Sequence, residues 1–166
     1  MKITDIRAIK ESATALFDER WALITAGTRE SYNTMTASWG GLGELWNKDV
    51  CFVFIRPQRY TYEFTEREGY FTVSFLPEEY RKALAFCGRN SGRDCDKAKE
   101  TGLTPEEFGE SMGFEESEIT LLCRKLYYQD ISPDGFVDGK IDGECYSAKD
   151  YHRMYIGEIV KVFIKE

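Results

Sequence analysis

Residues 21–40 read WALITAGTRESYNTMTASWG, and this stretch indicates the class of fold. Trp21–Gly27 is a short apolar run that ends at a glycine, and Asn33–Gly40 alternates small polar residues with larger ones. The polar patch Thr28–Tyr32 lies between them and has the composition of a turn. Two such runs joined by a short polar turn predict a β-hairpin.

The rest of the chain contains further strand-like runs and a few shorter helical ones. Aromatic and β-branched residues predict strands at Asp49–Ile55, Tyr70–Leu76, Ile119–Ile131 and Tyr151–Ile164. Apolar spacing and end signals predict helices at Gln58–Arg67, Glu78–Cys87 and Arg93–Gly102. Asp134–Gly143 is rich in turn residues. Thr104-Pro105-Glu106-Glu107 has the pattern of a helix start, so we interpret the acidic block Glu106–Glu118 as a surface helix and loop.

These elements predict a mainly β fold with inserted helices, an antiparallel barrel of Greek-key-like order. A Rossmann fold would alternate strands with longer helices. Gly41-x-Gly43 approaches a dinucleotide fingerprint, but Trp46 occupies the third glycine position. We therefore expect these glycines to let the chain turn a corner after the strand.

The composition fits one globular domain over residues 1–166. A formal net charge of -7 argues against a nucleic-acid binder. Residues 56–99 nevertheless hold nine Lys/Arg against seven Asp/Glu, a net +2, which suits a small anionic ligand. The same mixture of charges is also typical of a solvated helix face.

The cysteines and the N-terminus predict a cytoplasmic protein. Five cysteines form no CxxC pair, and residues 1–17 lack the apolar region of a signal peptide, so we expect reduced thiols. Val50–Ile55, the longest strongly apolar run, is too short to span a bilayer, and we expect no membrane partner. With His152 as the only histidine, neither a metal site nor a Ser-His-Asp set is expected.

Two kinds of segment suit a phosphorylated aromatic ligand. Asn33–Trp39 offers hydroxyls and amides, and Ala37 leaves room for a flat ring, although a polar strand face would have the same composition. Arg56-Pro57-Gln58-Arg59-Tyr60-Thr61 lies where a strand passes into a helix and suits a phosphate. Ser91-Gly92-Arg93-Asp94, followed by Lys97, is a second such place.

Taken together, these segments resemble the flavin reductase-like family, the FMN-binding split β-barrels that include flavoredoxin and the small reductase components of two-component monooxygenases. The resemblance covers roughly residues 21–164. It is carried by WALITAG, NTMTASWGGLG, VFIRPQRYTYEF, FTVSFL, SGRDCDK followed by GLTP, and HRMYIGEI.

The resemblance implies FMN as cofactor, NAD(P)H as reductant and a homodimer with FMN near the subunit interface. It implies that the strand from Asn33 to Trp39 lines the flavin ring and ribityl chain. The strand residues implied to lie closest are Thr34, Met35, Thr36 and Ala37. Residues implied at the ribityl-phosphate end are Ser38, Arg56, Tyr60 and Thr61, completed by Ser91, Arg93 and Lys97. His152 matches the histidine of an Asp-His pair near the nicotinamide, although Tyr151 precedes it here and Asp150 lies one place earlier.

Three functions remain open from the sequence. The first is an oxidoreductase that moves hydride from NAD(P)H to FMN and on to free flavin or a redox protein, chemistry that needs no dedicated acid–base residue. The second is a flavoredoxin-like electron carrier with little nicotinamide activity, whose acidic surface steers it to basic partners. The third is a non-redox barrel that binds a small anionic aromatic ligand.

Overall fold

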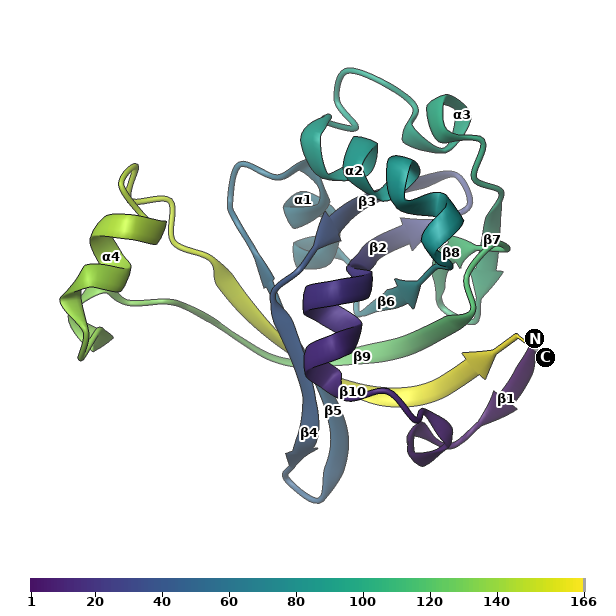
Figure 1. The fold of residues 1–166 in the computed structure, drawn as a ribbon, viewed down its shortest axis with the longest axis horizontal. Helices are drawn as coiled ribbons and strands as arrows, with labels where there is room; N and C mark the ends of the chain where they lie inside the picture. Colours follow the sequence, from purple (N-terminus) through teal and green to yellow (C-terminus); the bar gives the residue numbers. More distant parts are fainter. Residues whose placement is uncertain (166) are drawn as a thin grey trace.

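The computed structural model describes residues 1–165, and strands dominate it (Figure 1). The strands are β1 (Lys2–Thr4), β2 (Ala22–Thr28), β3 (Ser31–Ala37), β4 (Gly40–Leu45), β5 (Lys48–Ile55), β6 (Tyr70–Phe75), β7 (Pro105–Phe108), β8 (Ser111–Phe114), β9 (Ile119–Asp130) and β10 (Arg153–Ile164). The helices are α1 (Tyr60–Arg67), α2 (Arg81–Arg89), α3 (Lys97–Thr101) and α4 (Gly139–Cys145). Short 3₁₀ turns lie at Ile6–Ala8, Glu78–Tyr80 and Pro133–Gly135, and Ala15–Arg20 (η2) forms a π-helix.

One antiparallel sheet of eight described strands forms the body, in the order β3-β2-β6-β9-β10-β5-β4, with β1 added to the far end of β10. β3 and β4 lie at opposite ends of this order, although only Ser38 and Trp39 separate them in the chain. The sheet therefore curls until its two ends meet there. The predicted antiparallel, mainly β barrel with inserted helices is confirmed.

The sequence correctly located the hairpin, which pairs Ala22 with Ala37 and Thr28 with Ser31. The strands predicted near β5, β6, β9 and β10 are confirmed to within two residues at each end. The three predicted helices are present but shorter, and α3 begins only at Lys97. Asp96 caps this helix by accepting the Lys99 N–H.

Two predictions about local structure are wrong. Residues 104–107 do not start a helix: Pro105–Phe108 and Ser111–Phe114 form the β7–β8 hairpin. All four residues of β8 are buried, and this tertiary burial outweighs the local helix-start pattern. The glycines after β3 do not turn a corner either, because Gly40–Leu45 is strand β4 and the chain turns at Trp46 and Asn47.

Gly40 is required by close packing at the junction of β3 and β4. A Cβ placed on Gly40 would lie 2.2 Å from the ring of Phe17. Phe17 belongs to η2, is almost fully buried, and packs edge-on against Phe75 inside the barrel with ring centroids 5.5 Å apart. The η2 helix thus closes one side of the barrel core next to the strand junction.

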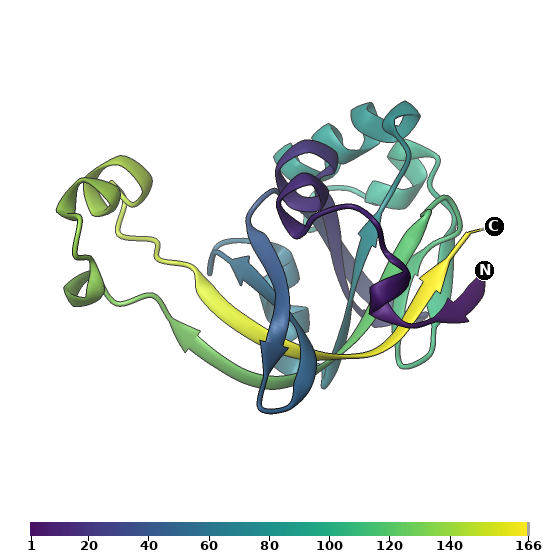
Figure 2. The same ribbon diagram turned by 60° about the horizontal axis from the view of Figure 1, so that its bottom comes forward.

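A long arm projects from the body where β9 and β10 extend beyond the rest of the sheet (Figure 2). Its outer part carries the Pro133–Gly135 turn and the helix α4. Both overlap the segment Asp134–Gly143 that the sequence predicted as turn-rich, but the helix was not predicted. The chain returns from α4 along residues 146–152 to the start of β10, where His152 is buried. The arm therefore connects directly to the end of the barrel at which β3 and β5 also end.

Candidate functional site

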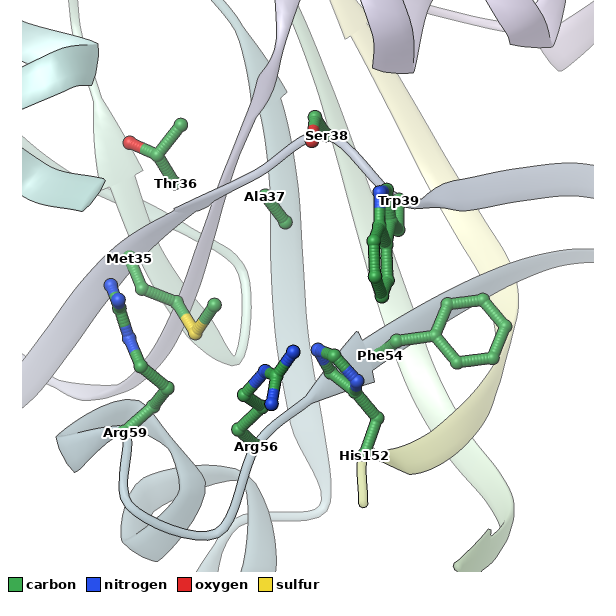
Figure 3. Close-up of a pocket in the computed structure, with 9 residues that line it drawn as sticks. All are labelled: Met35, Thr36, Ala37, Ser38, Trp39, Phe54, Arg56, Arg59 and His152. Atoms are coloured by element: carbon green, nitrogen blue, oxygen red, sulfur yellow. The ribbon is translucent and has the colours of Figure 1, made fainter. Parts of the chain in front are cut away.

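A pocket opens where β3 leaves the sheet, β5 ends and β10 begins (Figure 3). Its cavity volume is about 210 Å³. Its lining residues are Met35, Thr36, Ala37, Ser38, Trp39, Phe54, Arg56, Arg59 and His152. The structure therefore brings the second half of the Asn33–Trp39 stretch together with Arg56 and His152, although these residues lie far apart in the sequence.

β3 presents an open edge to this pocket, because it pairs with β2 on one side and ends the sheet order. The Thr34 carbonyl accepts from the Lys97 ammonium at 2.7 Å, so the Thr34 backbone points away from β2. Backbone direction alternates along an antiparallel strand, so the Thr36 N–H and C=O share this outward direction. An edge of this kind can hydrogen-bond the polar rim of a planar ligand.

Two further hollows adjoin the pocket. One, of about 230 Å³, shares Thr36 and Ser38 with it and also contacts Gly88 and Arg89 of α2. The other, of about 180 Å³, shares Arg59 with the pocket and Arg89 with the first hollow. The three spaces adjoin one another through these shared residues, and we refer to them together as the groove, which extends from Trp39 and His152 to Ser91.

The cationic end of the groove rests on Arg59, which lies in the basic segment predicted at residues 56–61, and on Arg89, which sequence reasoning did not select. The Arg59 guanidinium donates to the carbonyls of Gly88 at 2.7 Å and Cys87 at 3.3 Å, at the end of α2. Burial lowers the Arg59 pKa from its ordinary value. Arg89 is exposed, and among residues 1–165 its side chain has no hydrogen-bond or ion-pair partner. A free guanidinium beside a half-buried one suits an anion.

Phe54 is the second lining residue that sequence reasoning missed. It is half-buried on β5, where the inward positions Val53 and Ile55 are fully buried. The period-two alternation of a strand places Phe54 on the opposite face from these neighbours. That alternation could have identified Phe54 as a surface aromatic next to Arg56, whereas nothing local distinguishes Arg89 from other helix-end arginines.

Arg56 links the pocket to the arm. Its guanidinium forms an ion pair with Asp150 at 2.5 Å and donates to the Cys145 carbonyl at 2.9 Å. It also lies over the Tyr146 ring, 5.2 Å from the centroid. Asp150 has a lowered pKa because Arg56 and then Gln58 hydrogen-bond its carboxylate. Arg56 thus holds the returning segment of the arm while lining the pocket.

His152 and Trp39 form the aromatic end of the groove, with ring centroids 5.1 Å apart (Figure 3). The Nδ1 atom of His152 lies 2.9 Å from the Tyr146 hydroxyl. Burial, followed by the nearby Arg56 charge, lowers the pKa of His152 to about 4. His152 is therefore neutral at neutral pH. The sequence expectation of an Asp-His pair corresponds here to a Tyr-His pair, with Asp150 bonded to Arg56.

Several other predicted site residues line a different hollow, or hydrogen-bond to other residues of the protein, and do not line this pocket. The Asn33 side chain donates to the Thr61 hydroxyl at 2.7 Å, and both residues are buried. The Thr34 hydroxyl bonds to Thr25 at 2.8 Å inside the sheet. A further hollow of about 290 Å³ is lined in part by Asn33, Thr34, Tyr60 and Lys97, and the last two also line the cationic hollow. The Asn33–Trp39 stretch is thus divided between two spaces.

The loop predicted at the phosphate end is only partly available to a ligand. Lys97 donates to the carbonyls of Thr34 and Cys87, and burial lowers its pKa to about 8. Arg93 pairs with Glu63 and lies over the Tyr60 ring, 4.7 Å from the centroid. Ser91 accepts the Arg93 N–H and lines the cationic hollow together with Tyr60 and Lys97.

The donor set of the groove fits FMN. An aromatic end with Trp39 and His152 suits a ring, and the exposed Ser38 hydroxyl suits a polyol chain. Arg89 and Ser91 at the other end suit a phosphate. The described residues contain no cluster of three or more His, Cys, Asp or Glu that could hold a metal ion. No helix in this part of the chain is long and apolar enough to cross a membrane.

Comparisons with known proteins agree with this geometry. The model of the flavin reductase like domain matches residues 15–166. A comparison with curated protein sequences finds no match. The fold is similar to flavoredoxin of Desulfovibrio vulgaris (Miyazaki F), with 24% identity, TM-score 0.69, and coverage of 100% of this chain and 78% of that one.

Two further solved structures share the fold. An FMN-binding domain of a flavin reductases-like enzyme from Shewanella baltica OS155 has 16% identity and TM-score 0.70, with 98% of this chain and 76% of that one covered. Nitrilotriacetate monooxygenase component B from Bacillus cereus has 18% identity and TM-score 0.68, with coverage of 100% and 82%. The match over residues 15–166, together with the shared split-barrel fold, shows that the chain belongs to the flavin reductase-like family.

Proposed function

We propose that this protein is an FMN-dependent oxidoreductase that takes hydride from NADH or NADPH and delivers electrons to free flavin or to a redox protein. The observation that carries the proposal is the graded groove, aromatic at Trp39 and His152 and cationic at Arg59 and Arg89. Bound FMN would supply the redox chemistry, by accepting a hydride on its ring and releasing electrons to an acceptor.

The chain's own residues would bind, orient and shield the cofactor. The outward backbone of Thr36 would hydrogen-bond the ring edge, and Ser38 would contact the polyol chain. Arg89 and Ser91 would hold the phosphate at the cationic hollow. Arg59, which donates to carbonyls at the end of α2, would add positive charge to the same hollow. Trp39 and Phe54 flank the aromatic end with apolar surface, which limits water there.

The direct test is anaerobic reduction of the flavin-loaded protein. Protein reconstituted with FMN and freed of excess cofactor is mixed under argon with NADH and, separately, with NADPH. We expect the visible flavin absorption band to bleach with at least one of them, and to return when air is admitted. A band that persists with both nicotinamides, but bleaches with dithionite, would contradict hydride transfer while leaving FMN binding intact.

A flavoredoxin-like electron carrier is the second candidate function. The similarity to flavoredoxin of Desulfovibrio vulgaris favours it, as does the net charge of -7, which would steer the protein toward basic redox partners. Rapid steady turnover with NADH and free flavin alone would exclude this candidate. The colour of the protein as purified separates both flavin functions from the non-redox ligand-binding barrel, which would be colourless and take up no FMN.

We also propose a cytoplasmic homodimer. All five cysteines are free thiols in the structure, which suits a reducing compartment. Trp39, 47% exposed beside the pocket, offers apolar surface to a second subunit next to the flavin. Sedimentation equilibrium of the FMN-loaded protein tests the dimer, and a monomer mass at micromolar concentration would contradict it.

A further inference from the structure

Tyr146 contacts His152 in two ways at the junction between the arm and the barrel. Its hydroxyl lies 2.9 Å from His152 Nδ1, and the two rings pack edge-to-face with centroids 5.6 Å apart. Tyr146 is 3% exposed and His152 is 8% exposed, so water competes little for this hydrogen bond. The pair is therefore a buried polar contact with a fixed geometry.

An aromatic cluster on the arm fixes the Tyr146 ring. Tyr151 lies 4.9 Å and Phe136 lies 5.9 Å from it, centroid to centroid. Arg56 covers another side and donates to the carbonyl of the adjacent Cys145. The phenol is thus held from both the arm and the end of β5.

The charged groups around His152 favour the neutral ring. Arg56 comes from the end of β5, and its positive charge opposes protonation; Asp150, on the returning segment, favours protonation but is paired with Arg56. Trp39, the neighbour on the β3–β4 link, is uncharged. Burial is the largest influence, and the pKa of His152 falls to about 4. One ring nitrogen therefore carries a proton at neutral pH, and the other does not.

The Tyr146 hydroxyl determines which nitrogen is protonated. Burial raises the pKa of Tyr146, so its phenol is protonated at neutral pH. Among residues 1–165 the buried Tyr146 hydroxyl has no hydrogen-bond partner except His152 Nδ1, so its hydrogen has only this acceptor. Nδ1 is then the acceptor, and Nε2 on the opposite edge of the ring carries the proton.

We propose that Tyr146 is a positioning residue that holds His152 as the Nε2–H tautomer and so provides the pocket with a neutral hydrogen-bond donor beside Trp39. Such a donor would bind the carbonyl oxygen of an uncharged carboxamide, such as that of nicotinamide. The identity of this ligand rests on the proposed function, whereas the tautomer and its dependence on Tyr146 do not.

The tautomer can be measured directly, because the chain contains one histidine. Protein labelled with ¹⁵N-histidine gives a single set of ring nitrogen signals, recorded without added nicotinamide between pH 5.5 and 7.5. We expect a protonated-type shift for Nε2, an unprotonated-type shift for Nδ1, and no titration over this range. Protonated Nδ1, or a positively charged ring at pH 7, would overturn the proposal before any variant is made.

The variants Tyr146→Phe and Tyr151→Phe provide a matched pair. Both keep an aromatic ring in the same cluster, but the Tyr151 hydroxyl donates to Asp142 and not to His152. We expect Tyr146→Phe to move both nitrogen signals toward a mixture of tautomers and Tyr151→Phe to leave them unchanged. An unchanged spectrum in Tyr146→Phe, or equal changes in both variants, would contradict a role for the Tyr146 hydroxyl.

Reduction kinetics then test whether the Nε2–H group of His152 contributes to binding of the nicotinamide. In FMN-loaded Tyr146→Phe we expect the apparent Kd for the nicotinamide to rise about fivefold to tenfold, as for loss of one hydrogen bond, with FMN affinity unchanged. An unchanged nicotinamide Kd would refute the ligand role. Failure of the proposed function is distinguishable, because the wild type would then not be reduced at all while the nitrogen spectra kept their expected pattern.

Discussion

The structure places Arg89, and not Arg56, as the arginine available to a phosphate at the cationic end of the groove. It is exposed at the end of α2 and lines two of the three joined spaces. Arg56, which the sequence suggested for the same role, is bound to Asp150 and to the Cys145 carbonyl. An arginine without internal partners can give its full hydrogen-bonding capacity to a ligand.

We expect Arg89→Ala to weaken FMN binding by about 1.5–3 kcal/mol, the typical value of a hydrogen bond to a charged group. Protein stability should change by less than about 0.5 kcal/mol, because the side chain is exposed. Fluorescence titration with FMN measures the first quantity and urea unfolding of the apoprotein the second. Lys82→Ala, an exposed cation on the same helix outside the groove, is the control and should leave FMN affinity unchanged.

His152 also makes stability depend on pH. Its pKa is about 4 in the folded protein, below the ordinary value of 6.5, so between these values the unfolded chain binds a proton that the folded protein does not. Stability should therefore fall as pH decreases through this window. The contribution is about 2 kcal/mol between pH 7 and pH 5.

Urea unfolding of the wild type and of His152→Gln at the two pH values isolates this contribution. The variant has no imidazole to protonate, so its unfolding free energy should fall about 2 kcal/mol less than that of the wild type between pH 7 and pH 5. Carboxylate titration affects both proteins alike. Parallel pH dependence in the two proteins would show that His152 is not held neutral by burial.

At the scale of elements, β9 and β10 form the longest pairing of the sheet and carry the arm. The register between them shifts next to Gly157, where β10 passes closely over the core. A Cβ at this position would lie 2.7 Å from the Phe71 ring and 2.8 Å from the Cys123 Cβ. Phe71 and Cys123 are both essentially fully buried, so neither can move into solvent.

We expect Gly157→Ala to destabilise the protein by about 1–3 kcal/mol through overpacking. Gly41→Ala is the matched control, because Gly41 also lies in a strand but its added Cβ would meet only the Phe52 ring, at 3.9 Å. Thermal and urea unfolding compare the two variants. Equal stability of both would mean that the β9–β10 irregularity relaxes around the added methyl group.

At the scale of the whole molecule, the site depends on the closure of the sheet. The two ends of the strand order meet at Ser38 and Trp39, and the arm returns to the same place at His152. α2 and α3 lie over the β2–β3 side and supply the cationic end (Figure 1). A ligand that spans the groove would therefore connect α2, β3, β5 and the base of the arm.

Binding across these elements should stabilise the entire fold. At an FMN concentration of about 100 Kd we expect about 2.7 kcal/mol of added stability, a rise in Tm of about 5–11 °C for a chain of this size. Riboflavin at the same concentration lacks the phosphate and should give a clearly smaller rise. Differential scanning calorimetry measures both, and equal shifts for the two ligands would argue against a phosphate subsite at Arg89 and Ser91.

By itself the sequence determined the β2–β3 hairpin, the strands β5, β6, β9 and β10, and the presence of a small-residue strand and two basic segments, because these features depend on local periodicity and composition. Only the tertiary structure decided which side chains face the groove. Strand alternation and long-range packing direct Asn33 toward Thr61 and Arg56 toward Asp150, while Arg59 reaches the carbonyls of α2. Tertiary packing also decided the β7–β8 hairpin, because burial of Ser111–Phe114 outweighed the helix-start pattern at residues 104–107. The Tyr146–His152 contact likewise arises only where the arm folds back onto the barrel.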